Sequence, residues 1–297
     1  MSLFHGVSAF PITPTDAEGR CDHHALRRVL EPVARARVDS IGLLGSTGGY
    51  AYLTPDQRRE VLEVALDAIG GRVPVIAGIG ALRSDDATAL ARHAASAGAA
   101  GLLLAPVSYT PLTEEEVFQH FAAVAAATGL PLCIYNNPST THFTFSQRLL
   151  ERLAGLPTVA GVKMPLPADG DFTAEIGRLR AALPSDFAIG YSGDWGAAES
   201  LLAGADGFFS VAAGLLPDSF LRLARAAITG DAAGTARRDA AFGALWELFR
   251  EFGSLRVMFM AAREAGLTDA LPPRPILPLP EAQRDRVMAA MRAAEAA

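Results

Sequence analysis

The sequence predicts an α/β fold, a (β/α)8 TIM barrel with an appended C-terminal helical region. Eight short apolar runs alternate with longer Ala-, Leu- and Arg-rich segments of helical spacing, and the alternation stops after the eighth run. A doubly wound open sheet is the alternative. That fold is expected to show a glycine fingerprint after its first strand, and Pro11–Asp16 (PITPTD) is not one.

The eight apolar runs are the predicted strands. They are rich in Val, Ile, Leu and Phe and do not alternate strictly with polar residues, which suits strands buried on both faces of a parallel sheet. In chain order they cover residues 5–12, 40–45, 73–79, 101–107, 130–135, 158–163, 187–191 and 207–212.

Helix starts fall between these runs. Thr54–Gln57, Thr113–Glu116 and Thr144–Gln147 each match a capping box, in which a hydroxyl side chain and a Glu or Gln three residues later satisfy free backbone N–H groups. Ser84, followed by two aspartates, opens a further helix. Strand and helix signals therefore alternate as a barrel requires.

The chain beyond the eighth run is too long for the last barrel helix alone. Residues 217–297 read as several helices, interrupted by the Pro-rich stretch 271–280, which we interpret as a rigid connector. We assign residues 1–230 to the barrel and residues 231–297 to a C-terminal helical extension of the same domain.

Composition narrows the class of protein. The net charge of −6 and the pI of about 5.5 argue against a nucleic-acid-binding protein, which usually carries a basic stripe. No apolar run reaches the ~18 residues of a membrane span, and the N-terminus does not resemble a signal peptide. We therefore expect a cytoplasmic protein without membrane partners, in which Cys21 and Cys133 are free thiols.

Lys163, in the stretch GVKMPLP, is the only lysine in the chain, and the other 25 of the 26 basic residues are arginines. A surface lysine that supplies only charge is replaceable by arginine. A buried lysine can instead lose its proton and attack a carbonyl carbon, which a guanidinium does not do. The composition therefore makes Lys163 a candidate nucleophile, with a leftover surface lysine as the plain alternative.

Catalytic groups of such barrels lie at the C-terminal ends of the strands. The residues that end the predicted strands are Ser46, Thr47 and Gly48 after the second, Tyr109 after the fourth, Tyr135 at the fifth, Lys163 at the sixth, Ser192–Asp194 after the seventh and Ser210 at the eighth. With a 2-oxo acid the lysine could form a Schiff base, whose iminium acts as an electron sink.

Two other strand ends suit that chemistry. Tyr135 is a candidate proton shuttle, because a phenol both donates and accepts, although a packed aromatic is about equally compatible with its position. The Ser46–Gly48 turn offers hydroxyls and N–H groups to a small anion, although it could be an ordinary tight turn.

Other chemistries lack their motifs. The six histidines show no zinc-binding spacing, no G-x-S-x-G elbow is present, and no Walker-type phosphate loop occurs. We expect neither a metal nor another cofactor.

Three motifs together resemble the dihydrodipicolinate synthase / N-acetylneuraminate lyase family of class I pyruvate-dependent aldolases. They are the G-[ST]-T-G turn at Gly45–Gly48, the Y-N-x-P stretch at Tyr135–Pro138 and G-[IV]-K at Gly161–Lys163. The likeness covers nearly the whole chain and implies a homo-oligomer, a dimer or a tetramer.

The resemblance implies a role for each matching residue. Lys163 corresponds to the Schiff-base lysine and Tyr135 to the proton donor and acceptor. Ser46 and Thr47, with Gly48, correspond to the turn that holds the substrate carboxylate. Tyr109 corresponds to a tyrosine inserted into a neighbouring subunit's site, and the carbonyl of Phe209 to a backbone acceptor near the Schiff base.

The resemblance breaks down where a second substrate would bind. Thr140 stands where the synthases carry an arginine for the carboxylate of aspartate semialdehyde, Gly49 replaces a usual glutamate, and Met164 follows the lysine where an acidic residue is common. Trp195 follows Ser192–Asp194 without the acidic pair expected of sialic acid lyases.

Three hypotheses follow from these features. The first is a Schiff-base lyase or aldolase acting on pyruvate or another 2-oxo acid by cleavage, addition or dehydration. The second is the synthase itself, and the third is a non-catalytic protein that binds small acids. The retention of Lys163, Tyr135 and Thr47 argues against the third, because a scaffold needs none of them.

Overall fold

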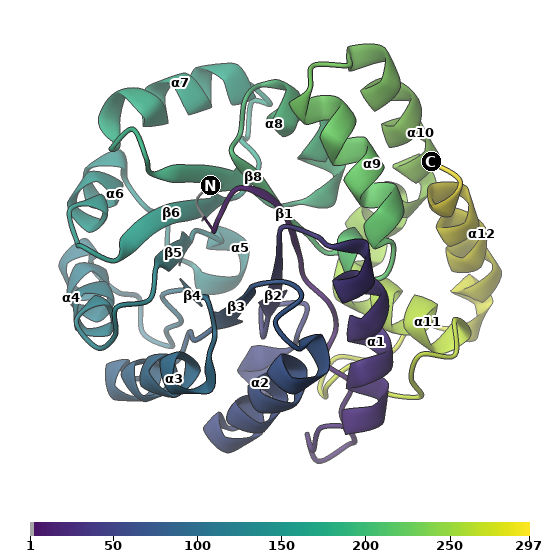
Figure 1. Ribbon diagram of the computed structural model, residues 1–297, viewed down its shortest axis with the longest axis horizontal. Coiled ribbons are helices and arrows are strands. Elements are labelled where there is room, and N and C mark those ends of the chain that lie inside the picture. The colour runs from purple at the N-terminus through teal and green to yellow at the C-terminus, as the bar shows by residue number, and fades with distance from the viewer. Residues whose placement is uncertain (1–2) are drawn as a thin grey trace.

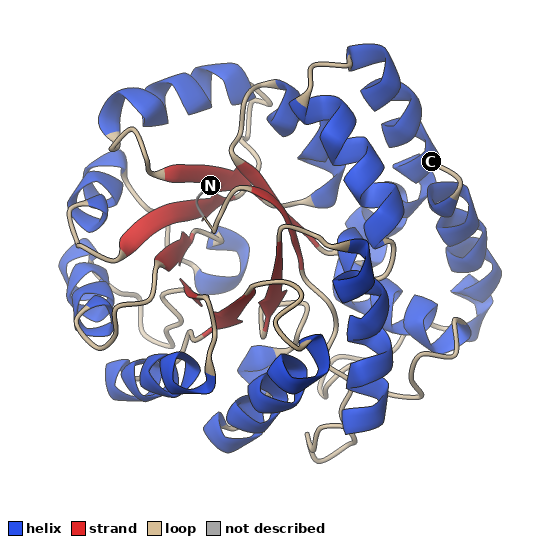
Figure 2. Ribbon diagram, viewed as in Figure 1, coloured by secondary structure: helices blue, strands red, loops and turns tan. Residues whose placement is uncertain are grey.

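The computed structural model describes residues 3–297, and its centre is a closed barrel of eight parallel strands (Figures 1 and 2). β1 pairs with both β2 and β8, which closes the sheet and removes its edges. The strands are β1 (Gly6–Ala9), β2 (Ser40–Leu43), β3 (Val75–Gly78), β4 (Gly101–Leu104), β5 (Leu132–Tyr135), β6 (Val159–Met164), β7 (Ala188–Tyr191) and β8 (Gly207–Ser210).

Helices form an outer ring around this barrel (Figure 1). They are α1 (His23–Ala36), α2 (Pro55–Ile69), α3 (Ser84–Ala97), α4 (Glu114–Ala125), α6 (Gln147–Ala154), α7 (Phe172–Ala182), α8 (Ala197–Leu202) and α9 (Pro217–Ile228). A short extra helix, α5 (Pro138–Thr141), lies between β5 and α6. It carries part of the site described below.

The C-terminal region adds three helices to one side of the ring. They are α10 (Ala232–Phe252), α11 (Ser254–Glu264) and α12 (Arg284–Glu295), and α10 packs against α9, α11 and α12 (Figure 1). The predicted fold class, a TIM barrel with an appended C-terminal helical region, is therefore confirmed. Each strand lies within the apolar run that predicted it, except that β6 extends one residue beyond its run, to Met164.

Two of the three predicted capping boxes are present. Thr54 caps α2 and Thr113 caps α4, each with the reciprocal side-chain bond from the third residue of the helix. The prediction at Thr144 is wrong. α6 begins at Gln147 and its cap is Ser146, whose hydroxyl accepts from the N–H of Leu149, so Thr144 lies too far before the helix to serve its first turn.

Two apolar layers hold the fold. The larger lies between the outer face of the barrel and the helices, while a smaller cluster fills the barrel interior and includes Phe4, Phe10, Ile76, Tyr135 and Phe209. Both cysteines are free thiols, as predicted. Among the residues that the structure describes, no helix combines the length and apolarity needed to cross a bilayer.

The ring of Phe10 occupies space that only a glycine leaves open. A Cβ added to Gly42 on β2 would lie 2.2 Å from Cζ of Phe10, well inside contact distance. Phe10 also packs edge-to-face on Phe209, with ring centroids 5.9 Å apart, so the ring has little room to retreat. Gly42 thereby allows an aromatic floor to form inside the barrel.

We expect Gly42→Ala to destabilise the protein by about 1–3 kcal/mol, because inserting a methyl group into a packed core forces side chains out of position. Chemical denaturation measures the free energy of unfolding. The matched control is Gly243→Ala in α10, where an added Cβ meets nothing within 4 Å and alanine is the better helix former. A Gly42→Ala protein as stable as its parent would show that the floor rearranges freely.

Candidate active site

A cavity of about 560 Å³ lies at the C-terminal ends of the strands, where barrel enzymes bind substrates. Its lining comes from residues at or just after the ends of β1, β2, β5, β6, β7 and β8 and from the C-terminal helices. The lining residues are Phe10, Ser46, Thr47, Tyr135, Asn137, Ser139, Thr140, Lys163, Pro165, Leu166, Ser192, Gly193, Asp194, Trp195, Phe209, Val211, Phe249, Gly253 and Ser254.

Lys163 and Tyr135 are placed together by strand register. Tyr135 at the end of β5 pairs directly with Lys163 on β6, so both side chains leave the sheet on the same face. Both line the cavity, and Lys163 is only 5% exposed. The alternative of a leftover surface lysine is excluded by this burial.

Three aromatic rings surround the lysine amine. Its Nζ lies 4.1 Å from the ring centroid of Phe10, 4.1 Å from that of Tyr135 and 5.6 Å from that of Phe209. These rings make the surroundings of the amine apolar, and Lys163 is itself among the residues that line the cavity. A buried amine in such surroundings is suited to nucleophilic attack on a carbonyl carbon.

The phenol of Tyr135 has polar partners on two sides. Its oxygen lies 3.3 Å from Oγ of Ser46 and accepts a hydrogen bond of 2.9 Å from Nδ2 of Asn137. Burial raises the pKa of the phenol, but the charge of Lys163 and these hydrogen bonds lower it, and the net shift is downward. A phenol tuned in this way can give up and recover its proton more readily than a free tyrosine.

The turn after β2 reaches the same cavity. Ser46 and Thr47 both line it, and the Thr47 side chain is buried. Gly48 lies in the turn itself, where a Cβ would come within 3.0 Å of the backbone nitrogen of Leu44. Ser46 and Thr47, two of the three residues that the sequence grouped as an anion-binding turn, therefore line the same cavity as the lysine and tyrosine.

The remaining predicted site residues do not all line the cavity. Thr140, in α5, lines the cavity with an exposed side chain, and Phe209 on β8 contributes its ring to the surroundings of the amine. Tyr109 does not line the cavity, and its side chain is 96% exposed. The structure therefore brings all of them except Tyr109 and Gly48 into the lining.

Sequence reasoning did not single out Phe10 and Asn137, and it named Asp194 only as part of the turn after the seventh strand, with no role. Phe10 lies directly after β1, but the predicted first strand ran on to residue 12, so its predicted end did not point to Phe10. Asn137 occupies the variable position of the Y-N-x-P stretch, so the motif carries no signal for it.

Asp194 joins the loops that follow β7 and β8. Its carboxylate accepts from Oγ of Ser210 at 2.6 Å and from the N–H groups of Ala212 at 2.9 Å and Val211 at 3.2 Å. Burial raises the pKa of this carboxyl, and these donors oppose the rise. The bonds join the two loops that form one wall of the cavity.

The C-terminal helices supply another wall. Phe249 and Gly253 end α10 and Ser254 begins α11, and all three line the cavity. Gly253 has a φ of 82°, which lets the chain break between the two helices at this point. The appended region is therefore part of the site.

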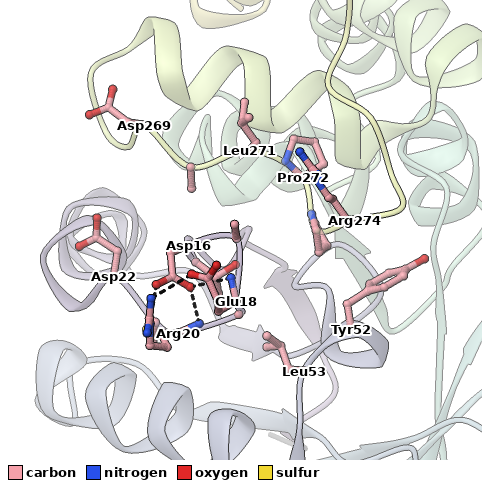
Figure 3. A pocket seen from close by; sticks show the side chains of 16 residues that line it. Asp16, Glu18, Arg20, Asp22, Tyr52, Leu53, Asp269, Leu271, Pro272 and Arg274 are labelled. Atoms are coloured by element: carbon pink, nitrogen blue, oxygen red, sulfur yellow. Dashed lines mark hydrogen bonds and ion pairs between the residues drawn. The ribbon is translucent and has the colours of Figure 1, made fainter.

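A second, larger cavity of about 760 Å³ lies outside the barrel, between residues 15–22 and residues 269–274 (Figure 3). Arg20 is paired there with Asp16 and Glu18, and none of the predicted site residues lines it. Burial raises the pKa of the nearby Cys21 thiol to about 12, so the thiol is not a ready nucleophile. The chemistry therefore favours the smaller cavity.

The described residues contain no group of three or more His, Cys, Asp or Glu side chains that could hold a metal ion. Lys163 is the only cation among the residues that line the 560 Å³ cavity. A site with one amine, one phenol and several hydroxyls suits covalent chemistry on a carbonyl compound.

Comparisons with known proteins show to which family the chain belongs. The model of the dihydrodipicolinate synthetase family matches residues 3–294. A 4-hydroxy-tetrahydrodipicolinate synthase from Azoarcus sp. (strain BH72) is 35% identical over 288 residues, which cover 95% of this chain and 96% of that protein.

Solved structures show the same relationship. A dihydrodipicolinate synthase from Agrobacterium tumefaciens str. C58 is 57% identical, with a TM-score of 0.97 and 98% of both chains covered. A chloride-inhibited dihydrodipicolinate synthase from Acinetobacter baumannii, solved as a complex with pyruvate, is 28% identical, with a TM-score of 0.89 and 99% of both chains covered. The chain is therefore an enzyme, a lyase that belongs to the dihydrodipicolinate synthetase family of class I aldolases.

Proposed function

We propose that this enzyme forms a Schiff base between Lys163 and pyruvate or another 2-oxo acid, and that it then makes or breaks the neighbouring carbon–carbon bond or eliminates water. The observation that carries the proposal is the placement of the chain's one lysine, 5% exposed and walled by aromatic rings, beside the phenol of Tyr135. No metal or other cofactor is needed for this reaction.

The steps assign a task to each group. The amine of Lys163 attacks the keto carbon, a carbinolamine forms, and loss of water leaves an iminium. Tyr135 donates the proton that the departing hydroxyl needs and later takes a proton back, with Ser46 as its neighbour for exchange. Ser46, Thr47 and the Gly48 turn hold the substrate carboxylate, and the carbonyl of Phe209 accepts a hydrogen bond near the imine.

The second candidate function is 4-hydroxy-tetrahydrodipicolinate synthase itself, the activity named for the Azoarcus relative. The overall match of the chain favours it. The part of the cavity where a second substrate would bind argues against this candidate, because Thr140 and neighbouring hydroxyls line it and no arginine does. We therefore place the synthase second and a 2-oxo acid lyase or aldolase with a different second substrate first.

The assembly and location of the enzyme are also proposals. The Tyr109 side chain is 96% exposed outside the cavity, and it fits the role of a residue inserted into a neighbouring subunit's site. We propose a cytoplasmic homo-oligomer, a dimer or a tetramer, in which such exchange occurs.

Borohydride trapping tests the Schiff base directly. Treatment with pyruvate and borohydride should add one reduced pyruvyl group to the intact protein, because hydride converts the imine to a stable amine. Since Lys163 is the only lysine, the N-terminal amine is the only competitor, and peptide mapping separates the two. A protein of unmodified mass would contradict the proposal.

Removing the proton carrier should slow the reaction without removing the nucleophile. We expect Tyr135→Phe to lower kcat by about 10²–10⁴-fold, the usual contribution of a general acid–base group, and to slow imine trapping. Thr47→Val should also lower kcat, because it deletes a buried hydroxyl beside the substrate. Full activity in both variants would show that the relay assigned to these residues is wrong.

A further inference from the structure

Asn137 touches the phenol of Tyr135 and occupies the variable position of the Y-N-x-P stretch. Its Nδ2 donates to the phenol oxygen of Tyr135 at 2.9 Å, which is shorter than the 3.3 Å from that oxygen to Oγ of Ser46. The Asn137 side chain lines the same cavity as Lys163. The phenol thus has one hydroxyl partner and one amide partner.

The amide is held in one orientation by its neighbours. Oγ of Ser139 donates to Oδ1 of Asn137 at 2.7 Å, which leaves the NH₂ end of the amide toward the phenol. The backbone carbonyl of Asn137 accepts from the N–H groups of Thr140 at 3.1 Å and Thr141 at 3.0 Å and from the Thr141 hydroxyl at 2.9 Å. The short helix α5 therefore holds both the main chain and the side chain of Asn137.

The two partners of the phenol differ in what they can do. An amide NH₂ group is a donor and takes up no proton, whereas a hydroxyl both donates and accepts. With Asn137 occupying one lone pair of the phenol oxygen, the phenol's own hydrogen is free to point to Ser46 or to a substrate. A donor also binds more tightly as negative charge develops on the oxygen.

We infer that Asn137 is a positioning residue of the proton relay, whose Nδ2 donor orients the Tyr135 phenol and stabilises its phenolate, while Ser46 remains the partner for proton exchange. The consequence for turnover rests on the proposed function. The consequence for the phenol itself does not, because it concerns the ionisation of Tyr135 in the protein without substrate.

The first test follows the ionisation of Tyr135 by the ultraviolet absorbance of phenolate. The chain has five tyrosines, and subtracting the titration of the matching variant that also carries Tyr135→Phe isolates this one. We expect Asn137→Leu, which keeps the approximate shape and removes the donor, to move the ionisation of Tyr135 to higher pH. Asn137→Asp should move it in the same direction, because a carboxylate repels a phenolate.

The control variant is Thr140→Val. It removes a neighbouring hydroxyl that lines the cavity and touches the backbone of Asn137 but not the phenol. The ionisation of Tyr135 should be the same in this variant as in the parent. Thermal unfolding of all variants reports whether each is folded. If Asn137→Leu does not fold, the titration of Asn137→Asp, which is the smaller change, takes its place as the test.

The second test is the pH dependence of kcat. We expect Asn137→Leu to lower kcat by about 10- to 100-fold, the size of a lost hydrogen bond to a charged group, and to shift the limb of the profile that reports Tyr135 to higher pH. A residue that only supports the fold would lower activity without moving that limb.

The results separate the inference from the function on which it partly rests. An ionisation of Tyr135 that is unchanged, or that moves to lower pH, in Asn137→Leu overturns the inference, since a shift downward would mean that the phenol donates to Oδ1. If the parent forms no borohydride adduct with pyruvate, the proposed function fails whatever the titration shows. If the adduct forms and Tyr135 ionises at the same pH in Asn137→Leu as in the parent, only the role of Asn137 fails.

Discussion

Replacing Lys163 by arginine should abolish turnover while the barrel still folds. Guanidinium keeps its proton and does not form an imine, so the loss should be about 10⁴-fold or more, as expected when the covalent nucleophile of a catalytic unit is removed. The guanidinium would lie among the rings of Phe10, Tyr135 and Phe209, which interact favourably with a cation. Stability should therefore change far less than activity.

Intact mass after treatment with pyruvate and borohydride is the measurement for this variant, beside steady-state turnover. No adduct should form in Lys163→Arg. The matched control is Arg27→Lys, which places a second amine on the surface of α1, where Arg27 pairs with Asp67. That variant should gain no additional adduct and keep full activity. An adduct that survives Lys163→Arg would place the reactive amine elsewhere.

The second large effect concerns the other substrate. We expect poor activity with pyruvate and aspartate semialdehyde, because the cavity has no arginine in its lining and Thr140 offers a single neutral hydroxyl. Losing one member of a buried charged pair costs about 2–5 kcal/mol. That corresponds to roughly 30- to several-thousand-fold in binding, at ~1.4 kcal/mol per factor of ten. A neutral or hydroxylated aldehyde, or a longer 2-oxo acid, should be preferred.

A substrate panel tests this preference. Aspartate semialdehyde, 4-hydroxy-2-oxoglutarate, 2-keto-3-deoxy sugar acids and N-acetylneuraminate are compared at equal concentration. Thr140→Arg should raise activity with aspartate semialdehyde, since it restores a charge-assisted, bidentate partner for the carboxylate. Thr140→Gln is the control of similar reach without charge, and it should give little gain.

Two arginines outside the lining could still bind the carboxylate of aspartate semialdehyde, and variants of each test this. Arg250 lies over the ring of Trp195, 5.4 Å from its centroid, and Arg256 donates to the carbonyl of Phe252 at 3.2 Å. If aspartate semialdehyde were the best substrate of the parent enzyme, the prediction would be wrong. Arg250→Ala and Arg256→Ala would then show whether either residue binds its carboxylate.

Much of the fold is a local property of the chain. Runs of β-branched and aliphatic residues bounded by caps marked the strands, and Thr54 and Thr113 marked helix starts, because capping depends on residues only three apart. The failure at Thr144 has the same origin. Two hydroxyl residues stand near that helix start, and the path of the chain decides that Ser146 is the cap.

The sequence alone also indicated several of the groups that meet at the candidate site. A single lysine at a strand end, a tyrosine at the end of the strand before it and a Ser-Thr-Gly turn are all named by position, because parallel strands of a barrel end on the same face. The register between β5 and β6 then places Tyr135 against Lys163, as the order of the strands already implied.

Only the tertiary structure decided the shape of the site. The ring of Phe10 reaches Lys163 because Gly42 leaves room for it, Asp194 binds Ser210 across two loops, and Phe249 enters from a helix outside the barrel. The donor from Asn137 to Tyr135 likewise depends on how Ser139 turns the amide. These contacts join side chains far apart in sequence or depend on rotamers, and no periodicity or spacing in the chain encodes them, because packing selects them only when the whole barrel has closed.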